Sequence, residues 1–183
     1  MRRFVFLTPL ALSLIIGAFA VWGLLNDRNP SEIPSALINR SVPNFDLLPL
    51  PGLNSPGLSK KELLNLEKVS VVNFFASWCL PCRAEHQSFI KLSRNDDIEL
   101  LGINYKDNDK DALDWLTELG NPYTYVGNDF SGRTGIDWGI TGVPETFIVN
   151  KNGKVVHRFS GPLVGERFEE FKELLMLELK LYK

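Results

Sequence analysis

The chain opens with an apolar stretch and continues with a body in which short apolar runs alternate with polar segments. Phe4 to Leu25 carries no charged residue over 22 positions. At about 1.5 Å per residue, a helix of that length spans roughly 33 Å, close to the ~30 Å hydrocarbon core of a bilayer. Arg2 and Arg3 precede it, which favours a cytoplasmic N-terminus and an exported body. The pattern therefore predicts a single-pass membrane anchor at residues 1–25.

The segment after the apolar stretch is polar and broken by prolines, so residues 26–40 are interpreted as a tether. A cleaved secretory signal is the alternative, because Ala18-Phe19-Ala20 fits the A-x-A cleavage pattern. The apolar core of a signal usually runs over about 7–15 residues, which is shorter than this stretch. Either interpretation places the body, residues 41–183, outside the cytoplasm, which in a bacterium is the periplasm.

The first half of the body alternates predicted strands and helices. Val69 to Ala76 and Ile98 to Tyr105 are nearly continuous runs of β-branched, aromatic and other apolar residues, typical of strands buried on both faces. Arg83 to Leu92 follows the first run with a helical pattern, and a helix ending at Leu119 follows the second. Before them, Ser59 is a predicted helix cap. Strand, helix, strand order predicts parallel central strands covered by helices.

The second half of the body predicts a hairpin and a closing helix. Glu145 to Asn150 and Lys154 to Phe159 flank an Asn-Gly turn, which indicates two antiparallel strands. Glu166 to Leu181 repeats apolar residues at spacings of three and four, as in an amphipathic helix. Tyr123 to Val126 predicts a short strand, whereas residues 128–142, with four glycines, predict irregular structure with one helical turn near Ile136. The fold class is therefore α/β, with a mixed central sheet flanked by helices.

Composition and charge narrow the functional classes. The 183 residues include 22 acidic and 20 basic side chains, a net charge of −2, which argues against nucleic-acid binding. The chain holds only two cysteines, Cys79 and Cys82. Two cysteines exclude a four-cysteine zinc site and a scaffold with several disulfides.

The two cysteines form a C-x-x-C motif where a buried strand gives way to a helix. Unpaired N–H groups and the positive dipole end of that helix favour a thiolate, so a lowered thiol pKa is expected. Cys79 at the helix end is predicted to be exposed and to attack, and Cys82 one turn further to be shielded and to resolve the mixed disulfide. Pro81 suits the first helical turn, where a missing N–H has no consequence.

A metal site or a structural disulfide is the alternative for this motif. Zinc would need Cys79, Cys82, His86 and His157, but His86 is expected one turn after Cys82 in the same helix, unlike a finger-like site. His86 is instead interpreted as a helix-surface residue. A C-x-x-C disulfide closes too short a loop to stabilise the fold much. Redox chemistry without a bound metal is therefore the preferred interpretation.

Longer motifs carry a family resemblance. Phe75 to Arg83 (FASWCLPCR) resembles the active-site motif of the thioredoxin superfamily, and Gly142 to Thr146 (GVPET) resembles its cis-proline loop. WCLPCRAEH, GINYKD, GNP and GVPETFIV together resemble the CcmG/DsbE family. Members of that family are membrane-anchored periplasmic thiol–disulfide reductases of cytochrome c maturation with a thioredoxin-like fold.

This resemblance implies roles for particular residues. Cys79 would be the nucleophile and Cys82 the resolving cysteine, with no cofactor besides this dithiol. Pro144 would be cis, and Val143 would offer its backbone to an extended substrate. The client would be apocytochrome c or a haem-ligation component, and a DsbD-type transmembrane protein would supply electrons.

One position departs from ordinary thioredoxins. Where their buried strand carries an Asp that helps to move the proton of the resolving cysteine, this chain has Asn73, which cannot titrate. Glu85 and Glu145 are the two candidate replacements, and a nearby carboxylate would raise the thiol pKa. Trp78 is expected to pack beside the site, and Asp107, after the second strand, to line its rim.

Three other functions stay open on the sequence. The same fold serves a general periplasmic reductase with another client, such as a TlpA-like or sporulation-type protein. The body is also compatible with a chaperone module that holds apocytochrome and uses its cysteines secondarily. An oxidase would need an unusually oxidising dithiol, which residue patterns do not reveal.

Overall fold

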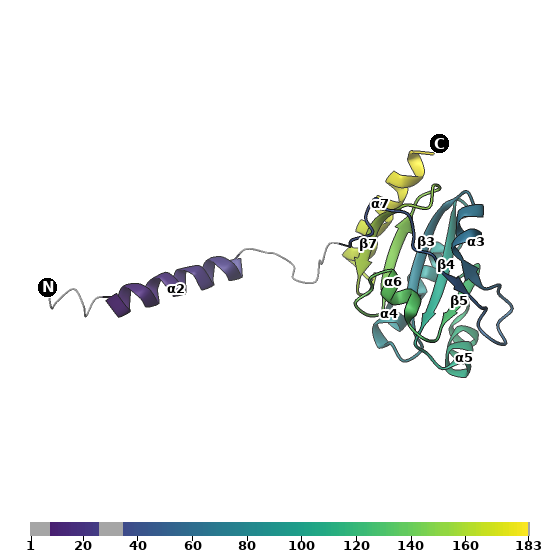
Figure 1. The fold of residues 1–183 in the computed structure, drawn as a ribbon, viewed down its shortest axis with the longest axis horizontal. Coiled ribbons are helices and arrows are strands. Elements are labelled where there is room, and N and C mark those ends of the chain that lie inside the picture. Colours follow the sequence, from purple (N-terminus) through teal and green to yellow (C-terminus); the bar gives the residue numbers. More distant parts are fainter. Residues whose placement is uncertain (1–7, 26–34, 183) are drawn as a thin grey trace. The chain divides into compact units, whose positions relative to one another are not determined.

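The structure, a computed structural model, describes residues 8–25 and 35–182 (Figure 1). The chain divides into two units, Met1–Ile33 and Pro34–Lys183. Helix α2, Thr8–Leu25, belongs to the first unit. Over the described ranges, no helix combines the length and the apolar character needed to cross a membrane. Residues 1–7 of the predicted anchor and residues 26–34 of the predicted tether lie outside the described residues.

The second unit is built on a five-stranded sheet with the order β5-β4-β3-β6-β7. Strands β3, β4 and β5 run parallel to one another, and β6 and β7 add an antiparallel hairpin beside β3. A two-stranded sheet, β1-β2, accompanies it. The elements are β1 Asp46–Leu47, β2 Leu58–Ser59, α3 Lys60–Asn65, β3 Val69–Phe75, α4 Leu80–Leu92, β4 Ile98–Tyr105, α5 Asp109–Leu119, β5 Tyr125–Asp129, α6 Arg133–Asp137, β6 Glu145–Val149, β7 Val155–Ser160 and α7 Glu166–Lys180.

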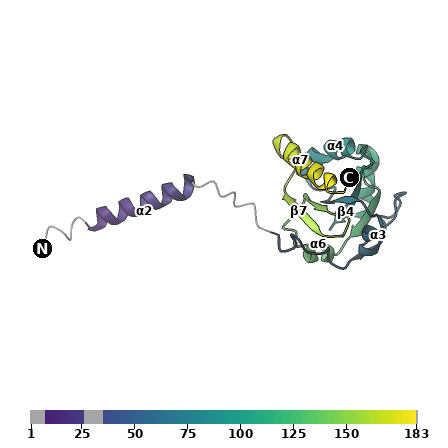
Figure 2. The same cartoon turned by 90° about the horizontal axis from the view of Figure 1, so that it is seen from above.

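Helices cover both faces of the sheet (Figure 2). Helices α4 and α7 lie on one face, where Phe89 and Phe171 enter a core cluster, and α3 and α6 lie on the other. Every residue of β3 is buried, as its continuous apolar run predicts for a central strand. Trp138 fills the second cluster with an edge-on contact to Phe74 at 5.6 Å between ring centroids. The predicted α/β class, the parallel central strands, and the hairpin that precedes the closing helix are confirmed.

The segment predicted as mostly irregular is more regular than expected, and the helical turn indicated near Ile136 is present. Strand β5 runs from Tyr125 to Asp129 rather than over residues 123–126, and the five-residue helix α6 follows it. The Asp129 carboxylate accepts hydrogen bonds from the backbone N–H groups of Thr134 and Gly135, at 3.3 and 2.8 Å. A helix of five residues is too short to show apolar periodicity. Its first N–H groups are held by the side chain of Asp129, at the end of the preceding strand.

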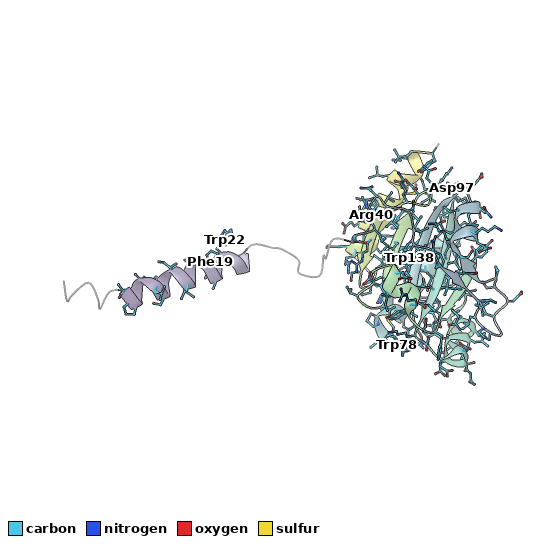
Figure 3. The ribbon with its side chains drawn as sticks, viewed as in Figure 1. Phe19, Trp22, Arg40, Trp78, Asp97 and Trp138 are labelled. Atoms are coloured by element: carbon cyan, nitrogen blue, oxygen red, sulfur yellow. A yellow bond between two sulfur atoms is a disulfide. The ribbon has the colours of Figure 1, made fainter. Side chains whose placement is uncertain are left out.

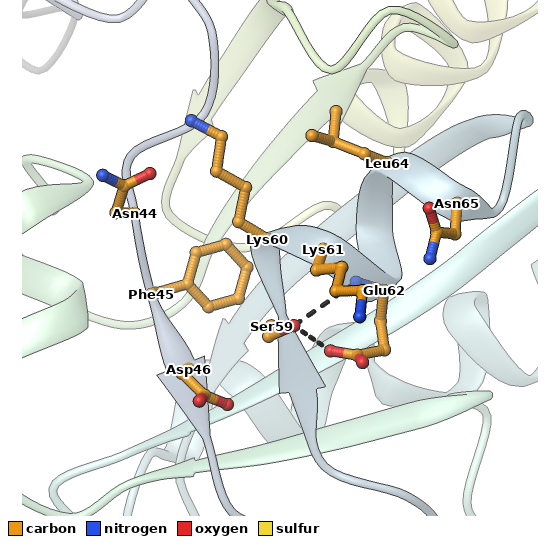
Figure 4. Close-up of a pocket in the computed structure, with 9 residues that line it drawn as sticks. All are labelled: Asn44, Phe45, Asp46, Ser59, Lys60, Lys61, Glu62, Leu64 and Asn65. Atoms are coloured by element: carbon orange, nitrogen blue, oxygen red, sulfur yellow. Dashed lines mark hydrogen bonds between the residues drawn. The ribbon is translucent and has the colours of Figure 1, made fainter.

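The predicted cap of α3 is confirmed. The Ser59 hydroxyl accepts the backbone N–H of Glu62 at 3.3 Å and donates to the Glu62 carboxylate (Figure 4). Serine followed three residues later by glutamate is a capping-box pattern, which satisfies free donors at a helix start. A surface pocket opens beside this cap. It is lined by Asn44, Phe45, Asp46, Ser59, Lys60, Lys61, Glu62, Leu64 and Asn65, and therefore contains neither cysteine.

Candidate active site

The two cysteines lie together at the carboxyl end of β3, where α4 begins. A disulfide joins Cys79 to Cys82, with their Cα atoms 5.3 Å apart. Cys79 is the N-cap of α4, and its sulfur accepts the backbone N–H of Cys82 at 3.1 Å. Pro81 occupies the first turn, as predicted. The sulfur of Cys79 therefore lies at a helix N-terminus, where free N–H donors and the helix dipole favour a thiolate.

The expected exposure of Cys79 is wrong for this disulfide state. Cys79 is 3% exposed and Cys82 1%, and both belong to the core cluster beneath α4. Val143, half-buried, packs against the same cluster. Neighbouring side chains project into solvent, among them Trp78, 60% exposed, and Leu80, 77% exposed. Trp78 projects at one end of the domain, whereas Trp138 lies inside it (Figure 3).

The loop before β6 contains the cis Val143–Pro144 peptide bond that the family resemblance implies. Glu145 follows it directly. Its carboxylate accepts the backbone N–H and hydroxyl of Thr141, at 2.6 and 2.7 Å, and two N–H groups of Arg158, at 2.7 and 2.9 Å. The side chains of Arg158 and Glu145 are 6% and 1% exposed. Glu145 is thus the centre of a buried ion pair that fixes the cis-proline loop to β7.

Glu85 lies in a different environment, one turn after Cys82 on α4. It is 1% exposed, and one carboxylate oxygen accepts the side-chain N–H of Asn73 at 3.0 Å. The other oxygen accepts the backbone N–H of Leu163 at 2.7 Å. Burial raises the pKa of Glu85 to about 7, opposed by these two hydrogen bonds and by the charge of Arg167. This carboxyl group can therefore gain or lose a proton near neutral pH.

The two candidate carboxylates lie on opposite faces of the sheet. In β3, Asn73 pairs with Thr146 and Phe74 pairs with Glu145. Successive residues of a strand point to opposite faces, so Glu145 shares the face of Phe74 while Asn73 points toward α4 and Glu85. Asn73, which matches the thioredoxin aspartate, is hydrogen-bonded directly to Glu85. The structure therefore joins Asn73 to Glu85 on the sheet face covered by α4, which also buries Cys82, and places the Glu145 carboxylate on the other face.

The sequence predicts that Asp107 lines the rim of the site, but the residue is buried instead, with 4% of it exposed. Its carboxylate accepts the backbone N–H of Ser77, the Ser77 hydroxyl at 2.7 Å, the Asn104 amide at 2.9 Å and the backbone N–H of Asn108 at 2.9 Å. The indole N–H of Trp78 donates to the carbonyl of the neighbouring Lys106 at 3.0 Å. Asp107 is drawn inward because the segment before Cys79 supplies donors. It anchors that segment to the end of β4.

His86 is also buried, contrary to its expected place on the helix surface. It is 1% exposed, its Nε2 lies 2.8 Å from the Gly120 carbonyl, and its ring meets Trp115 edge-on at 4.3 Å. Burial is the main cause of its lowered pKa. The buried face of α4 consists of Cys82, Glu85, His86, Phe89 and Leu92. Their spacing of three and four residues is that of a helix face that packs on the core. The pattern is hard to recognise in the sequence because Glu85 and His86 are polar.

Other residues around the site have no local sequence signal. Tyr123 donates its hydroxyl to the Asn73 side-chain carbonyl at 2.7 Å, and Thr146 accepts an N–H of the same amide at 3.0 Å. Arg158 pairs with Glu145 across the hairpin. The hairpin register indicated by the Asn-Gly turn places Arg158 opposite Phe147, two residues from Glu145 and on the same face. This register is the one pattern that could have identified Arg158.

Known proteins are similar to this chain in sequence and in fold. The sequence profile of the Redoxin family matches residues 39–175. A thiol:disulfide interchange protein DsbE homolog from Paracoccus denitrificans is 40% identical over 170 residues, covering 92% of each chain. The thiol:disulfide interchange protein DsbE of Escherichia coli is 40% identical over 174 residues, covering 93% of this chain and 92% of its own.

A solved structure of a DsbF homologue from Corynebacterium diphtheriae superimposes with a TM-score of 0.63. It is 19% identical and covers 80% of this chain and 96% of its own, so it supports the fold alone.

Proposed function

This chain belongs to the Redoxin family and, within it, to the DsbE family of thiol:disulfide interchange proteins, and we propose that it is a membrane-anchored periplasmic reductase of cytochrome c maturation. It is a thiol:disulfide oxidoreductase. The observation that carries the proposal is the Cys79–Cys82 pair at the start of α4, beside the Val143–Pro144 loop.

The proposed reaction begins with the protein in its dithiol form. The Cys79 thiolate attacks one sulfur of a client disulfide, forming a mixed disulfide and releasing one client thiolate, which takes up a proton. The Cys82 thiolate then attacks the Cys79 sulfur and releases the second client thiolate. Two electrons pass to the client, and Cys79 and Cys82 become the disulfide seen in the structure. No cofactor besides the dithiol is required.

Glu85 is proposed as the group that takes the proton from Cys82. Its burial, its pKa of about 7 and its place one turn from Cys82 on the same helix face support this role. Its charged form is stabilised by N–H donors from Asn73 and Leu163 and by the charge of Arg167, and no salt bridge to Glu85 occurs among the described residues. Glu145 is proposed instead to position the Val143–Pro144 loop, which would present backbone to an extended client.

The proposed client is a polypeptide with a reducible disulfide, apocytochrome c or a haem-ligation component that has engaged it. Haem attachment requires free thiols, and the periplasm is kept oxidising, so a dedicated reductant is needed there. A DsbD-type transmembrane protein would return two electrons to Cys79–Cys82 after each cycle. This assignment rests on the family resemblance of the motifs that contain Glu85 and Glu145.

Membrane anchoring is proposed from the sequence of residues 4–25, 22 positions without a charge. Such a stretch is as long as a bilayer core is thick. An anchor would confine the catalytic domain near membrane-bound partners and raise their effective concentration. Alkaline extraction of membranes tests the anchor. The full chain should stay in the membrane pellet, and a chain lacking residues 1–25 should not associate with it.

A double Cys79→Ser, Cys82→Ser variant separates a reductase from a chaperone module. In a bacterium without its own reductase of this kind, the variant should fail to support cytochrome c maturation, and an added small thiol should restore it. Wild-type chain at matched expression is the positive control. Full maturation by the variant without added thiol would contradict the proposal.

A further inference from the structure

A hydrogen-bonded chain of three side chains leads from Tyr123 to Glu85. The Tyr123 hydroxyl donates to the Asn73 side-chain carbonyl at 2.7 Å. The NH2 group of Asn73 donates to Glu85 and to the Thr146 hydroxyl, each at 3.0 Å. Asn73 is fully buried and Tyr123 is 5% exposed. The amide of Asn73 thus has its carbonyl and both N–H groups engaged, and its orientation is fixed by three different segments.

The Asn73 amide makes these contacts in one orientation only. If it turned by 180°, its carbonyl oxygen would face the Glu85 carboxylate, and two acceptors would oppose each other. Its NH2 group would then face the Tyr123 hydroxyl, whose proton would lose its acceptor. A buried donor without an acceptor is costly, so the hydroxyl of Tyr123 favours the observed orientation.

We propose that Tyr123 is a positioning residue, which holds the Asn73 amide with its NH2 group toward the Glu85 carboxylate. This inference rests on the proposed role of Glu85 in proton transfer. Tyr123 touches neither cysteine in any described hydrogen bond and acts through Asn73. In this chain, Asn73 is therefore a fixed donor to the titrating group rather than an inert replacement for an aspartate.

The ring of Tyr123 is held rigidly enough for this role. It stacks on Phe75 at 5.0 Å between ring centroids, with an angle of 17° between the planes. Gly102 of β4 makes room for it, because a Cβ on Gly102 would lie only 2.8 Å from the tyrosine ring. The hydroxyl is thus placed by packing on β3 and β4, the two central strands of the sheet.

The charged and titratable groups near Glu85 come from two helices and from the segment before β5. Cys82 precedes it on α4, Arg167 lies on α7, and Tyr123 precedes β5. Of these, Arg167 favours the charged form of Glu85 through its charge, and the Asn73 amide favours it through a hydrogen bond. Loss of the fixed amide removes one of these contributions, so the pKa of Glu85 should rise.

A Tyr123→Phe variant tests the proposal because it removes the hydroxyl and keeps the ring. The pKa of Glu85 should rise by about one pH unit, the amount expected from losing one hydrogen bond to a charged group. Carboxyl carbon NMR signals of the oxidised protein measure this pKa without any turnover. Tyr125→Phe is the matched control, because Tyr125 packs in the cluster on the other face of the sheet.

A double-variant cycle shows whether Tyr123 acts through Asn73. In an Asn73→Leu background, Tyr123→Phe should no longer move the pKa of Glu85. Should Asn73→Leu fail to fold, the Asn73 side-chain NH2 signals supply the same test. They should shift with the titration of Glu85 in the wild-type protein and lose most of that shift in Tyr123→Phe.

The inference is overturned if Tyr123→Phe leaves the pKa of Glu85 unchanged. It is overturned equally if the shift persists at full size without Asn73, since the hydroxyl would then act directly. A raised Glu85 pKa together with an unchanged pH profile of thiol exchange supports the positioning role. That same result contradicts proton transfer by Glu85, so the two claims fail separately.

Discussion

Glu85 and Glu145 are two buried carboxylates on opposite faces of one sheet, and their partners differ. Glu145 meets a guanidinium at 2.7 Å and two donors of Thr141, and it joins a loop to a strand. Glu85 receives neutral N–H donors from Asn73 and Leu163, and its pKa rises to about 7. The directly paired cation makes Glu145 a tie between a loop and a strand, whereas Glu85, buried among neutral donors, has a raised pKa. Burial alone therefore does not identify the proton-transfer group.

Removing Arg158, the cation paired with Glu145, should have the largest effect on stability. Arg158→Met leaves the Glu145 carboxylate buried without its partner, so we expect a loss of about 3–5 kcal/mol in the free energy of unfolding. Urea unfolding of the oxidised protein measures the loss. The exposed pair of Arg133 and Asp137 provides the control, since Arg133→Met should change stability by less than about 1 kcal/mol.

Adding Glu145→Gln to Arg158→Met should restore most of that stability, because no buried charge then remains unpaired. A double variant as unstable as Arg158→Met alone would show that the ion pair is not the cause.

The raised pKa of Glu85 should make stability depend on pH. Its pKa in the folded protein, about 7, exceeds the ordinary value of 4.5, so the folded state binds more protons between these values. Stability should therefore fall as pH rises through this window, by about 3 kcal/mol in total relative to Glu85→Gln. Urea unfolding at pH 4.5, 6 and 8 measures the difference, with exposed Glu118→Gln as control. Parallel pH profiles for the wild-type protein and Glu85→Gln would contradict a raised pKa.

Exchange kinetics should distinguish the two carboxylates directly. Glu85→Gln should slow the resolution of a mixed disulfide by about 30-fold near neutral pH. This effect is smaller than the usual contribution of about 10²–10⁴-fold from general acid–base catalysis, because water can accept the proton instead. Rapid-quench trapping of the mixed disulfide against pH measures this step. Glu145→Gln should leave the pH profile unshifted, because its carboxylate lies on the other face. A larger shift in Glu145→Gln would reverse the assignment.

Asp107 is a third buried carboxylate to set beside Glu85 and Glu145. Of the substitutions considered, its replacement should have the smallest effect. Like Glu85 it has only N–H and O–H donors in its described contacts, but it ties Ser77 to the end of β4. Asp107→Asn should lower stability by about 1.5 kcal/mol, because charge-assisted hydrogen bonds are lost. Thermal or urea unfolding measures this, and exposed Asp96→Asn is the control. Equal stability of the two variants would mean that Asp107 does not anchor the segment before Cys79.

The fold was predictable where the sequence has long, regular patterns. The continuous apolar runs of β3 and β4 and the Asn-Gly turn between β6 and β7 each identify an element and its pairing. For α6, the sequence indicated only a helical turn near Ile136 and not its bounds, because five residues show no period and Asp129 holds them through its side chain. Long periodic patterns thus identify elements with their bounds, whereas a short helix held by one side chain just before it leaves no periodic pattern to read.

The candidate site was predictable in its chemistry but not in its geometry. Motifs indicated Cys79, Cys82 and Pro144. Because Asn73 replaces the aspartate of ordinary thioredoxins, the sequence also indicated that another carboxylate accepts the proton of the resolving cysteine. Choosing between Glu85 and Glu145 needed the strand register, which places them on different faces. Tyr123 lies 50 residues from Asn73, so no local pattern relates the two.

The equilibrium of the Cys79–Cys82 pair with glutathione tests most directly whether this chain is a reductase. Mixtures of reduced and oxidised glutathione, followed by trapping of free thiols, give the reduction potential of the pair. We expect a potential more negative than about −180 mV, the value of a disulfide isomerase, and toward the thioredoxin end near −270 mV. A potential near about −120 mV, that of a strong oxidant, would contradict the account.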